Sequence, residues 1–288
     1  MPRFSPRRTN QIAPHLHFSG LITLCFAGLL AATPASAQWL GYKTQGIPRL
    51  EDGSADMAAK APRMPSGKPD FSGTWTSDEI DPRNPSVGAN PLDATPSRRM
   101  INLGVELEGG LPYKPWMADV VKERRANHSL DDPHVRCMPD NFLRSYAMPH
   151  LIKFVQRPEL LVVLNEWNGQ FRQIFIDGRE FPEEDNVWPS WQGYSTAKWD
   201  GDTLIVDTIG VRDHSWIDWS GSEVSDVAKI REEFTRPDFG HMRIKVTVDD
   251  PKGYTEPWTV EIRERLIVDT GLIEETCLEN EKSLEHMQ

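Results

Sequence analysis

The stretch Tyr194–Val211, YSTAKWDGDTLIVDTIGV, predicts a β-hairpin. Its turn is the dipeptide Asp200-Gly201, because Asp-Gly tolerates the positive φ angles that tight hairpin turns require. Along the outgoing strand, Leu204 and Val206 lie on one face and alternate with residues on the other, which is the two-residue period of a strand. The predicted strands are residues 196–199 and 203–211.

Short alternating segments continue on both sides of this hairpin. Asn168-Gly169 and Asp177-Gly178 predict two further hairpins, and His241–Val248 has one apolar and one polar face. Pro115–Ala126 predicts a helix, since Pro suits the first helical turn. The fold class is therefore mainly β: an antiparallel meander that forms a curved sheet or a lipocalin-like barrel, with one helix. The other predicted strands are residues 71–75, 152–156, 160–166, 171–176, 227–236, 258–268 and 272–278.

Residues 1–37 read as a signal peptide. A basic start with Arg3, Arg7 and Arg8 precedes the short apolar run Leu21–Leu30, and Ala35-Ser36-Ala37 fits a cleavage site. We therefore expect a periplasmic or secreted location, reached by Sec export with cleavage after Ala37. Residues 38–69 are expected to form an extended arm or linker, and residues 70–288 a single β-rich domain with a helical insertion.

The charge balance argues against two classes of partner. The chain has a net charge of −11 and would repel nucleic acid and anionic membrane surfaces. After the leader, no apolar run is long enough for stable membrane insertion. Cys137 and Cys277 follow the leader, and in an oxidising compartment they pair or remain two buried thiols. Ten Trp residues indicate large buried area or an aromatic ligand site.

The chain also resembles a family of exported bacterial β-rich proteins. The segments that carry the resemblance are PDFSGTW (69–75), YKPWMADVVKERRANHSLDDPHVRC (113–137), FRQIFIDGR (171–179), GYSTAKWDGDTLIVDT (193–208), EEFTRPDFGHMRIKVTVDDP (232–251) and YTEPWTV (254–260). An entry strand that ends in Gly-x-Trp also resembles the first strand of lipocalin-type barrels. The resemblance implies export and β architecture, and it implies no particular chemistry.

The first candidate site is the polar loop that follows the predicted helix. His128, Asp131, Asp132 and His134 lie within seven positions, with Cys137 just beyond. Such residues could bind a divalent metal, although the spacing matches no established site, and no metal is assigned. A His128–Asp132 pair could instead transfer protons. The third interpretation is turn formation and helix capping by the Asp side chains.

Two more candidate sites lie on and between the predicted strands. One contains Glu166, Arg172, Asp177 and Arg179, around the Asn168-Gly169 turn. Arg172 and Arg179 could hold a carboxylate, or the four residues could form an ion-pair ladder on a solvated face. Arg144 is a second candidate for an anionic group. The long connection with His214, Trp216 and Asp218, and Glu233 on the next strand, predicts a small-molecule pocket or a Trp-capped barrel end.

These observations lead to one functional prediction and one alternative. The prediction is an exported β-barrel enzyme that acts on a small, partly apolar or aromatic substrate by acid–base chemistry without a cofactor, of lyase, hydratase or isomerase type. The alternative is a periplasmic, lipocalin-like small-molecule-binding protein without catalysis. The predicted catalytic residues are His128, Asp132, His214, Asp218 and Glu233, and the predicted substrate-binding residues are Arg144, Arg172, Trp191, Tyr194 and Trp216.

Overall fold

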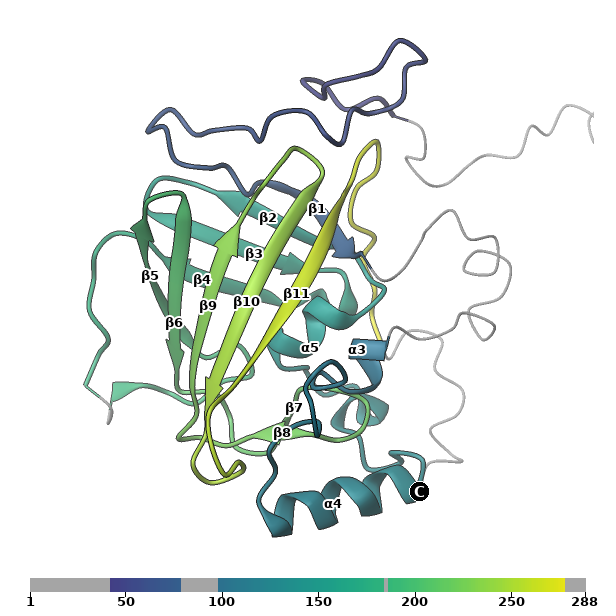
Figure 1. The fold of residues 1–288 in the computed structure, drawn as a ribbon, viewed down its shortest axis with the longest axis vertical. Coiled ribbons are helices and arrows are strands. Elements are labelled where there is room, and N and C mark those ends of the chain that lie inside the picture. The colour runs from purple at the N-terminus through teal and green to yellow at the C-terminus, as the bar shows by residue number, and fades with distance from the viewer. Residues whose placement is uncertain (1–41, 79–97, 184–185, 278–288) are drawn as a thin grey trace, which may run out of the picture. The chain divides into compact units, whose positions relative to one another are not determined.

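The chain folds around a closed barrel of nine strands (Figure 1). The computed structural model describes residues 42–78, 98–183 and 186–277. Around the barrel the order is β1-β11-β10-β9-β6-β5-β4-β3-β2. The strands are β1 Gly73–Ser77, β2 Ile152–Gln156, β3 Leu160–Asn165, β4 Phe171–Phe175, β5 Tyr194–Asp200, β6 Thr203–Ile209, β9 Lys229–Thr235, β10 His241–Asp249 and β11 Trp258–Ile267, and a separate two-stranded sheet pairs β7 Ser215–Trp216 with β8 Glu223–Val224. The predicted mainly β fold is confirmed.

Alternation along each strand builds the barrel core. On β10 the side chains of Met242, Ile244, Val246 and Val248 are fully buried, and the residues between them are polar and more exposed. Burying one face of every strand removes apolar surface from water, at roughly 25 cal/mol per Å². The two-residue period read from the sequence is therefore the period of burial in the barrel.

The hairpin of β5 and β6 forms with its turn one residue later than predicted. Asp200 pairs with Thr203, so that Gly201 and Asp202 are the two turn residues. Gly201 has a φ of 56°. A glycine with positive φ at the first central position is typical of a type II′ turn. The Gly of the Asp-Gly signal was the informative residue, and Asp200 belongs to the strand.

The barrel departs from a pure antiparallel meander between β4 and β5, which pair in parallel. Asp177-Gly178 therefore begins a long crossover and does not close a hairpin. The crossover returns along the barrel before β5 starts, because a parallel neighbour must begin at the same end as β4. The predicted strand 272–278 is also not formed over its described residues. Residues 271–276 run past the barrel without regular pairing.

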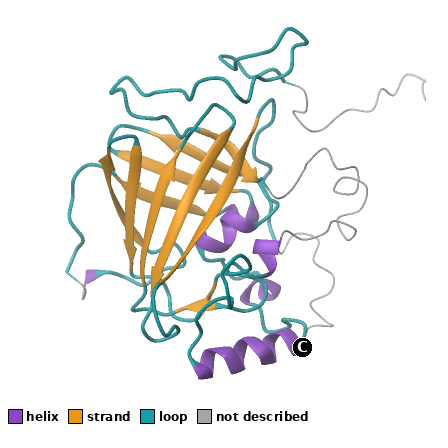
Figure 2. Ribbon diagram, viewed as in Figure 1, coloured by secondary structure: helices purple, strands orange, loops and turns teal. Residues whose placement is uncertain are grey.

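Three α-helices lie in the described residues, in addition to two short 3₁₀ helices (Figure 2). The predicted helix is confirmed as α4 Pro115–Ala126, with Pro in its first turn. The sequence reading missed α3 Arg98–Ile101 and α5 Phe142–Ala147. Every residue of α5 is buried, and its Ser145 accepts a hydrogen bond from Asn165 at the end of β3. The 3₁₀ helices are η2 Pro133–Arg136 and η3 Trp167–Gly169.

Residues 42–69 cross the end of the barrel that lies opposite helix α4 (Figure 1). Arg63 forms an ion pair with Asp202 in the β5–β6 turn, and the N–H of Gly240, before β10, donates to the carbonyl of Met57. Residues 42–69 thus form turns and isolated bridges, and they are attached to the strand turns. The predicted signal peptide, residues 1–37, lies outside the described residues. Within the described part of the chain, no helix combines the length and apolar character needed to cross a bilayer.

Candidate functional site: an aromatic groove beside a buried His–Asp pair

An open groove of about 480 Å³ lies on the outside of the barrel where β4 meets β5. Strand alternation explains its lining, because Arg172 and Ile174 of β4 point into the barrel and leave Phe171 and Phe175 outside. The Phe171 side chain is 63% exposed and offers an apolar ring to the groove. The groove is lined by Pro139, Asn168, Gly169, Gln170, Phe171, Arg172, Gln173, Phe175, Ser190, Trp191, Gln192, Gly193 and Tyr194.

The crossover supplies the second wall of the groove. The ring of Tyr194, the first residue of β5, lies 5.4 Å from the ring of Phe175. Just before it, Ser190 pairs with Val211 as an isolated bridge, so that Trp191 is held beside the end of β6. Gly193 has a φ of 64°, and a Cβ at this position would lie 2.6 Å from the Thr208 side chain. Glycine is therefore required where the crossover enters β5.

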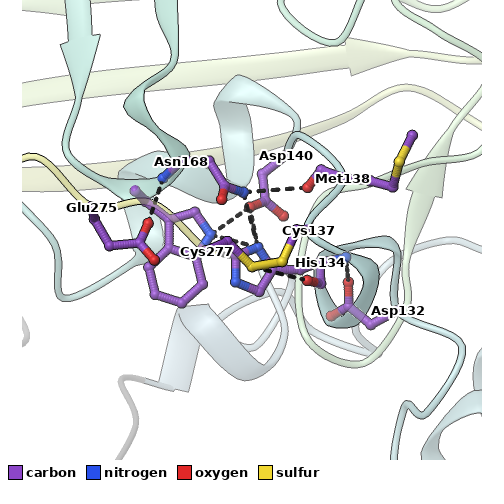
Figure 3. The surroundings of a disulfide bond; sticks show 9 residues. Asp132, His134, Cys137, Met138, Asp140, Asn168, Glu275 and Cys277 are labelled. Carbon is purple, nitrogen blue, oxygen red and sulfur yellow. Dashed lines mark hydrogen bonds and ion pairs between the residues drawn. A yellow bond between two sulfur atoms is a disulfide. The ribbon is translucent and has the colours of Figure 1, made fainter. Parts of the chain in front are cut away.

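A cluster around Asp140 (Figure 3) adjoins the groove, whose lining includes the neighbouring residues Pro139 and Asn168. His134 Nδ1 lies 3.0 Å from Asp140 Oδ2, and Trp167 Nε1 donates to the same oxygen at 2.5 Å. The Trp167 ring stacks on His134 with a centroid distance of 4.1 Å. The amides of Gln170 and Gln192, which line the groove, both donate to the Asp140 carbonyl. The groove wall and the His–Asp pair are thus joined by hydrogen bonds.

His150 packs on the other side of this cluster. Its ring centroid is 4.0 Å from that of Trp167. Burial and, to a smaller extent, the neighbouring His134 lower the pKa of His150 to about 4. His150 is therefore neutral at pH 7 and places no positive charge beside His134.

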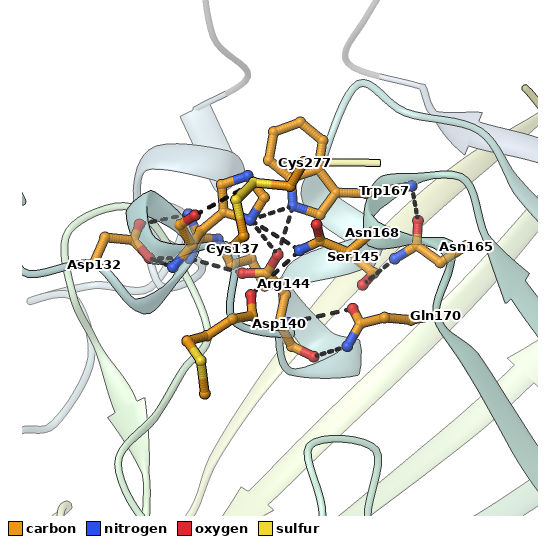
Figure 4. Close-up of polar contacts among 12 residues, drawn as sticks. Asp132, Cys137, Asp140, Arg144, Ser145, Asn165, Trp167, Asn168, Gln170 and Cys277 are labelled. Carbon is orange, nitrogen blue, oxygen red and sulfur yellow. Dashed lines mark hydrogen bonds and ion pairs between the residues drawn. A yellow bond between two sulfur atoms is a disulfide. The ribbon is translucent and has the colours of Figure 1, made fainter. Parts of the chain in front are cut away.

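Arg144 of α5 ties the same cluster to the barrel end (Figure 4). Its guanidinium donates to both carboxylate oxygens of Asp132, at 2.9 and 2.7 Å, and lies 2.9 Å from Asp140 Oδ1. All three side chains are buried. Buried charges are stable only when paired, so that Arg144 is occupied by two carboxylates and is not placed to bind a ligand anion as predicted.

The predicted His128–Asp132 pair does not form. Asp132 caps η2 by accepting the His134 N–H at 2.9 Å, and its carboxylate is otherwise taken by Arg144. The His128 imidazole is exposed and has no hydrogen-bond partner among the described residues. The capping interpretation of this loop is the one that the geometry matches.

Arg172 points into the barrel and away from the groove. It pairs with Glu232 of β9, donates to the Tyr146 hydroxyl at 2.9 Å, and stacks 3.6 Å from the Phe142 ring. These side chains fill the interior at this level and are almost completely buried. The predicted role of Arg172 in holding a substrate carboxylate is contradicted by this pairing. The ladder interpretation also fails, because the pair is inside the barrel.

The third predicted constellation is dispersed. Asp218 is fully buried and accepts the N–H groups of Ser222 and Leu103, and burial raises its pKa to about 6. His214 lies 2.7 Å from Glu223, whose hydrogen bond raises the pKa of this imidazole. Glu233 points outward to Lys245 at 3.0 Å.

Trp216 does not line a pocket with these residues. It is buried under the guanidinium of Arg124, which lies 4.6 Å from the centroid of the Trp216 ring. The same guanidinium pairs with Glu223. The alternative of a Trp-capped end describes this region better. Of the predicted binding residues, Trp191 and Tyr194 do lie together in the groove.

The residues that sequence reading missed are Phe171, Phe175 and the partner of His134, Asp140. The alternation of β4 was a usable signal for the two Phe residues, because a strand with Ile174 inside places them outside. For Asp140 no periodic signal exists. It lies in a loop that follows Cys137, whose φ is 55°.

Cys137 and Cys277 form a disulfide bond, with Cα atoms 5.5 Å apart (Figure 3). Of the two expectations for these cysteines, pairing is confirmed. Glu275 nearby accepts the N–H of Asn168 at 2.7 Å, which holds the C-terminal segment against the β3–β4 connection. Among the described residues, no group of three His, Cys, Asp or Glu side chains is placed to hold a metal ion.

Comparison of this chain with protein-family models, with curated proteins and with solved structures gave no match. The functional argument therefore rests on the groove and on the residues behind it.

Proposed function

We propose that this protein is an exported small-molecule-binding protein whose ligand has a planar apolar face. The observation that carries the proposal is the set of four aromatic rings that line one open groove: Phe171, Phe175, Trp191 and Tyr194. Ring faces pack well against other rings, and a groove of this size suits a ligand of one or two rings. Neighbouring exposed rings form an apolar patch, and such patches mark ligand-binding grooves.

The site differs from that of a lipocalin, which binds its ligand inside the barrel. Here the interior is occupied by Phe142, Tyr146, Arg172, Glu232 and Phe234, all buried. A ligand in the interior would have to displace a paired Arg and Glu. Binding on the outside, between β4 and β5, requires no such loss.

Two features support export. The first 37 residues have the basic, apolar and small-residue order of a signal peptide. The Cys137–Cys277 bond is a type of cross-link that persists in oxidising compartments such as the periplasm. Expression of the full chain in a bacterial host, followed by N-terminal sequencing of the periplasmic fraction, tests this part. A mature protein that begins at Gln38 is expected, and an uncleaved cytoplasmic protein would refute it.

The binding proposal is tested by ligand-observed NMR with small ring compounds and with non-aromatic compounds of matched size. Ring compounds are expected to bind the wild-type protein. Phe171→Ala is expected to weaken the binding of these compounds about threefold to tenfold, because an aromatic pair contributes about 0.5–1.5 kcal/mol. Val155→Ala, which shortens an exposed apolar side chain on β2, is the matched control and should change nothing. Equal binding by the wild type and Phe171→Ala would contradict the proposal.

A second candidate is catalysis on the same ligand, of the acid–base lyase, hydratase or isomerase type and without a cofactor. The observation that favours it is the His134–Asp140 contact behind the groove. In the tautomer in which Nδ1–H is donated to the Asp140 carboxylate, Nε2 of His134 is the atom that can accept a proton. In the other tautomer, Nδ1 accepts from Trp167 Nε1 at 2.8 Å. This role replaces the one predicted for His128. Once a ligand is known, His134→Gln should abolish turnover and leave binding intact. Unchanged turnover in this variant would refute the catalytic role of His134.

A further inference from the structure

Two arginines pack against aromatic rings that line the groove, and they differ in their partners. The guanidinium of Arg179 lies 3.8 Å from the Phe175 ring centroid and is neutralised by Asp177, with Nε 2.9 Å from Oδ1. The guanidinium of Arg212 lies 5.2 Å from the Trp191 ring centroid. Within the described chain, no carboxylate pairs with Arg212. One rim position is thus a satisfied ion pair, and the other is a cation with its donors free.

The backbone of Arg212 is fixed although its guanidinium is unpaired. Its N–H donates to the Ser190 carbonyl at 2.8 Å, and its own carbonyl accepts the Ser215 hydroxyl at 2.6 Å. Ser190 and Trp191 line the groove, so that this pairing sets the position of Arg212 at the groove edge. Stacking on an indole ring further restrains a guanidinium without using its N–H donors.

The charge of the groove contrasts with the charge of the chain. The whole protein has a net charge of −11, yet the lining of the groove includes no Asp or Glu. Another surface groove of similar size, near β9, is lined by both Asp226 and Asp249. The other strong candidates for anion binding, Arg144 and Arg172, are saturated by buried carboxylates. Of the arginines considered among the described residues, Arg212 is therefore the one that remains available to a ligand in the aromatic groove.

We propose that the ligand is a small aromatic carboxylate, with its ring against the aromatic groove and its carboxylate on the Arg212 guanidinium. This inference rests on the proposed binding function and names the ligand class. A guanidinium presents a planar pair of N–H donors that matches a carboxylate. The ring would give affinity and the charge would give selectivity over neutral ring compounds.

The test uses a matched pair of probes, 4-fluorobenzoate and 4-fluorobenzamide, which share a ring and differ in charge. Fluorine NMR of the full-length mature protein measures the dissociation constant of each probe. We expect the acid to bind about tenfold more tightly than the amide, the preference of a charge-assisted hydrogen bond. Arg212→Met should remove this preference and leave amide binding unchanged. Arg243→Met, which removes one exposed, unpaired cation from β10, is the control and should preserve the preference.

The outcomes separate the two proposals. If both probes bind equally to the wild type, or if Arg212→Met leaves the preference for the acid intact, the role of Arg212 is refuted and the aromatic groove remains a binding site. If neither probe binds, and if Phe171→Ala leaves the dissociation constant of every ring compound unchanged, the binding function itself is refuted. Raising the salt concentration should weaken the binding of the acid and leave the binding of the amide unchanged, since salt screens a solvent-exposed ion pair.

Discussion

Arg172 and Glu232 form an ion pair inside the barrel, between strands that are not neighbours in the sheet. Both side chains are nearly inaccessible to solvent. Ser195 and Thr208 contribute hydroxyl oxygens to the same guanidinium, at 3.0 and 2.9 Å. The pair therefore joins strands β4, β5, β6 and β9 through one cation.

We predict that Glu232→Ala destabilises the protein by about 3–5 kcal/mol, because it leaves the buried Arg172 charge without a partner. The double variant Arg172→Met, Glu232→Leu should recover most of that loss, since it removes both charges and keeps the volume filled. Urea unfolding followed by far-UV circular dichroism measures both. If the double variant is no more stable than Glu232→Ala, the cost does not come from an unpaired charge.

Glu264 predicts a pH dependence of stability. It is buried on the inner face of β11, neither carboxyl oxygen has a hydrogen-bond partner in the described chain, and burial raises its pKa well above the usual value. A carboxyl whose pKa is raised on folding favours the folded state below its unfolded pKa, and that contribution is lost as the pH rises. Glu264→Gln cannot titrate. Its stability relative to the wild type should therefore grow from about pH 4 upward. A constant difference in urea midpoint across that range would contradict the assignment.

Gly193 predicts a contrast between two glycines of the same crossover. Gly193→Ala combines a φ of 64° with a contact to Thr208, whereas Gly178 has a φ of 82° and open space where a Cβ would stand. Gly178→Ala should cost about 1–2 kcal/mol, the conformational penalty alone. Gly193→Ala should destabilise the protein clearly more. It should also weaken the binding of ring compounds, because the groove wall moves. Equal losses for both variants would mean that the space around Gly193 is not tight.

The disulfide predicts a large stabilisation because its cysteines are 140 positions apart. In the chain-entropy model a cross-link of this span contributes about 5 kcal/mol by restricting the unfolded chain. Cys137→Ser, Cys277→Ser should lower the urea midpoint accordingly, and reductant should lower the midpoint of the wild type to the same value. If reductant acts on the double variant as well, its effect does not come from this bond.

Local pattern was sufficient for most of the barrel. The alternation of β10 and the Pro at the start of α4 are local signals, and both elements form where predicted. The direction of β5 was not predictable from Asp177-Gly178, because a turn signal says that the chain bends and not which strand it will join. That choice depends on pairing with β4 and β6, which is long-range.

The site was only partly predictable for a similar reason. Trp191 and Tyr194 were chosen as ligand-binding residues and do share a groove, but the rings opposite them belong to β4. For β9, the choice of Glu233 overlooked its own alternation: Ile230 and Phe234 face inward, and Glu232 has the same parity. The partner of Glu232 is 60 residues away, and no local rule identifies it.

The parallel contact of β4 with β5 has a mechanical consequence. It is registered over two residue pairs, Ile174 with Ser195 and Phe175 with Thr196, while β10 and β11 are registered over eight. The barrel thus has a seam, and opening should begin there, with amide exchange fastest on both of its sides. Phe175 and Tyr194 stand on the two sides of that seam. A ligand that contacts both rings would hold the two strands together, and its binding should slow amide hydrogen exchange throughout the barrel.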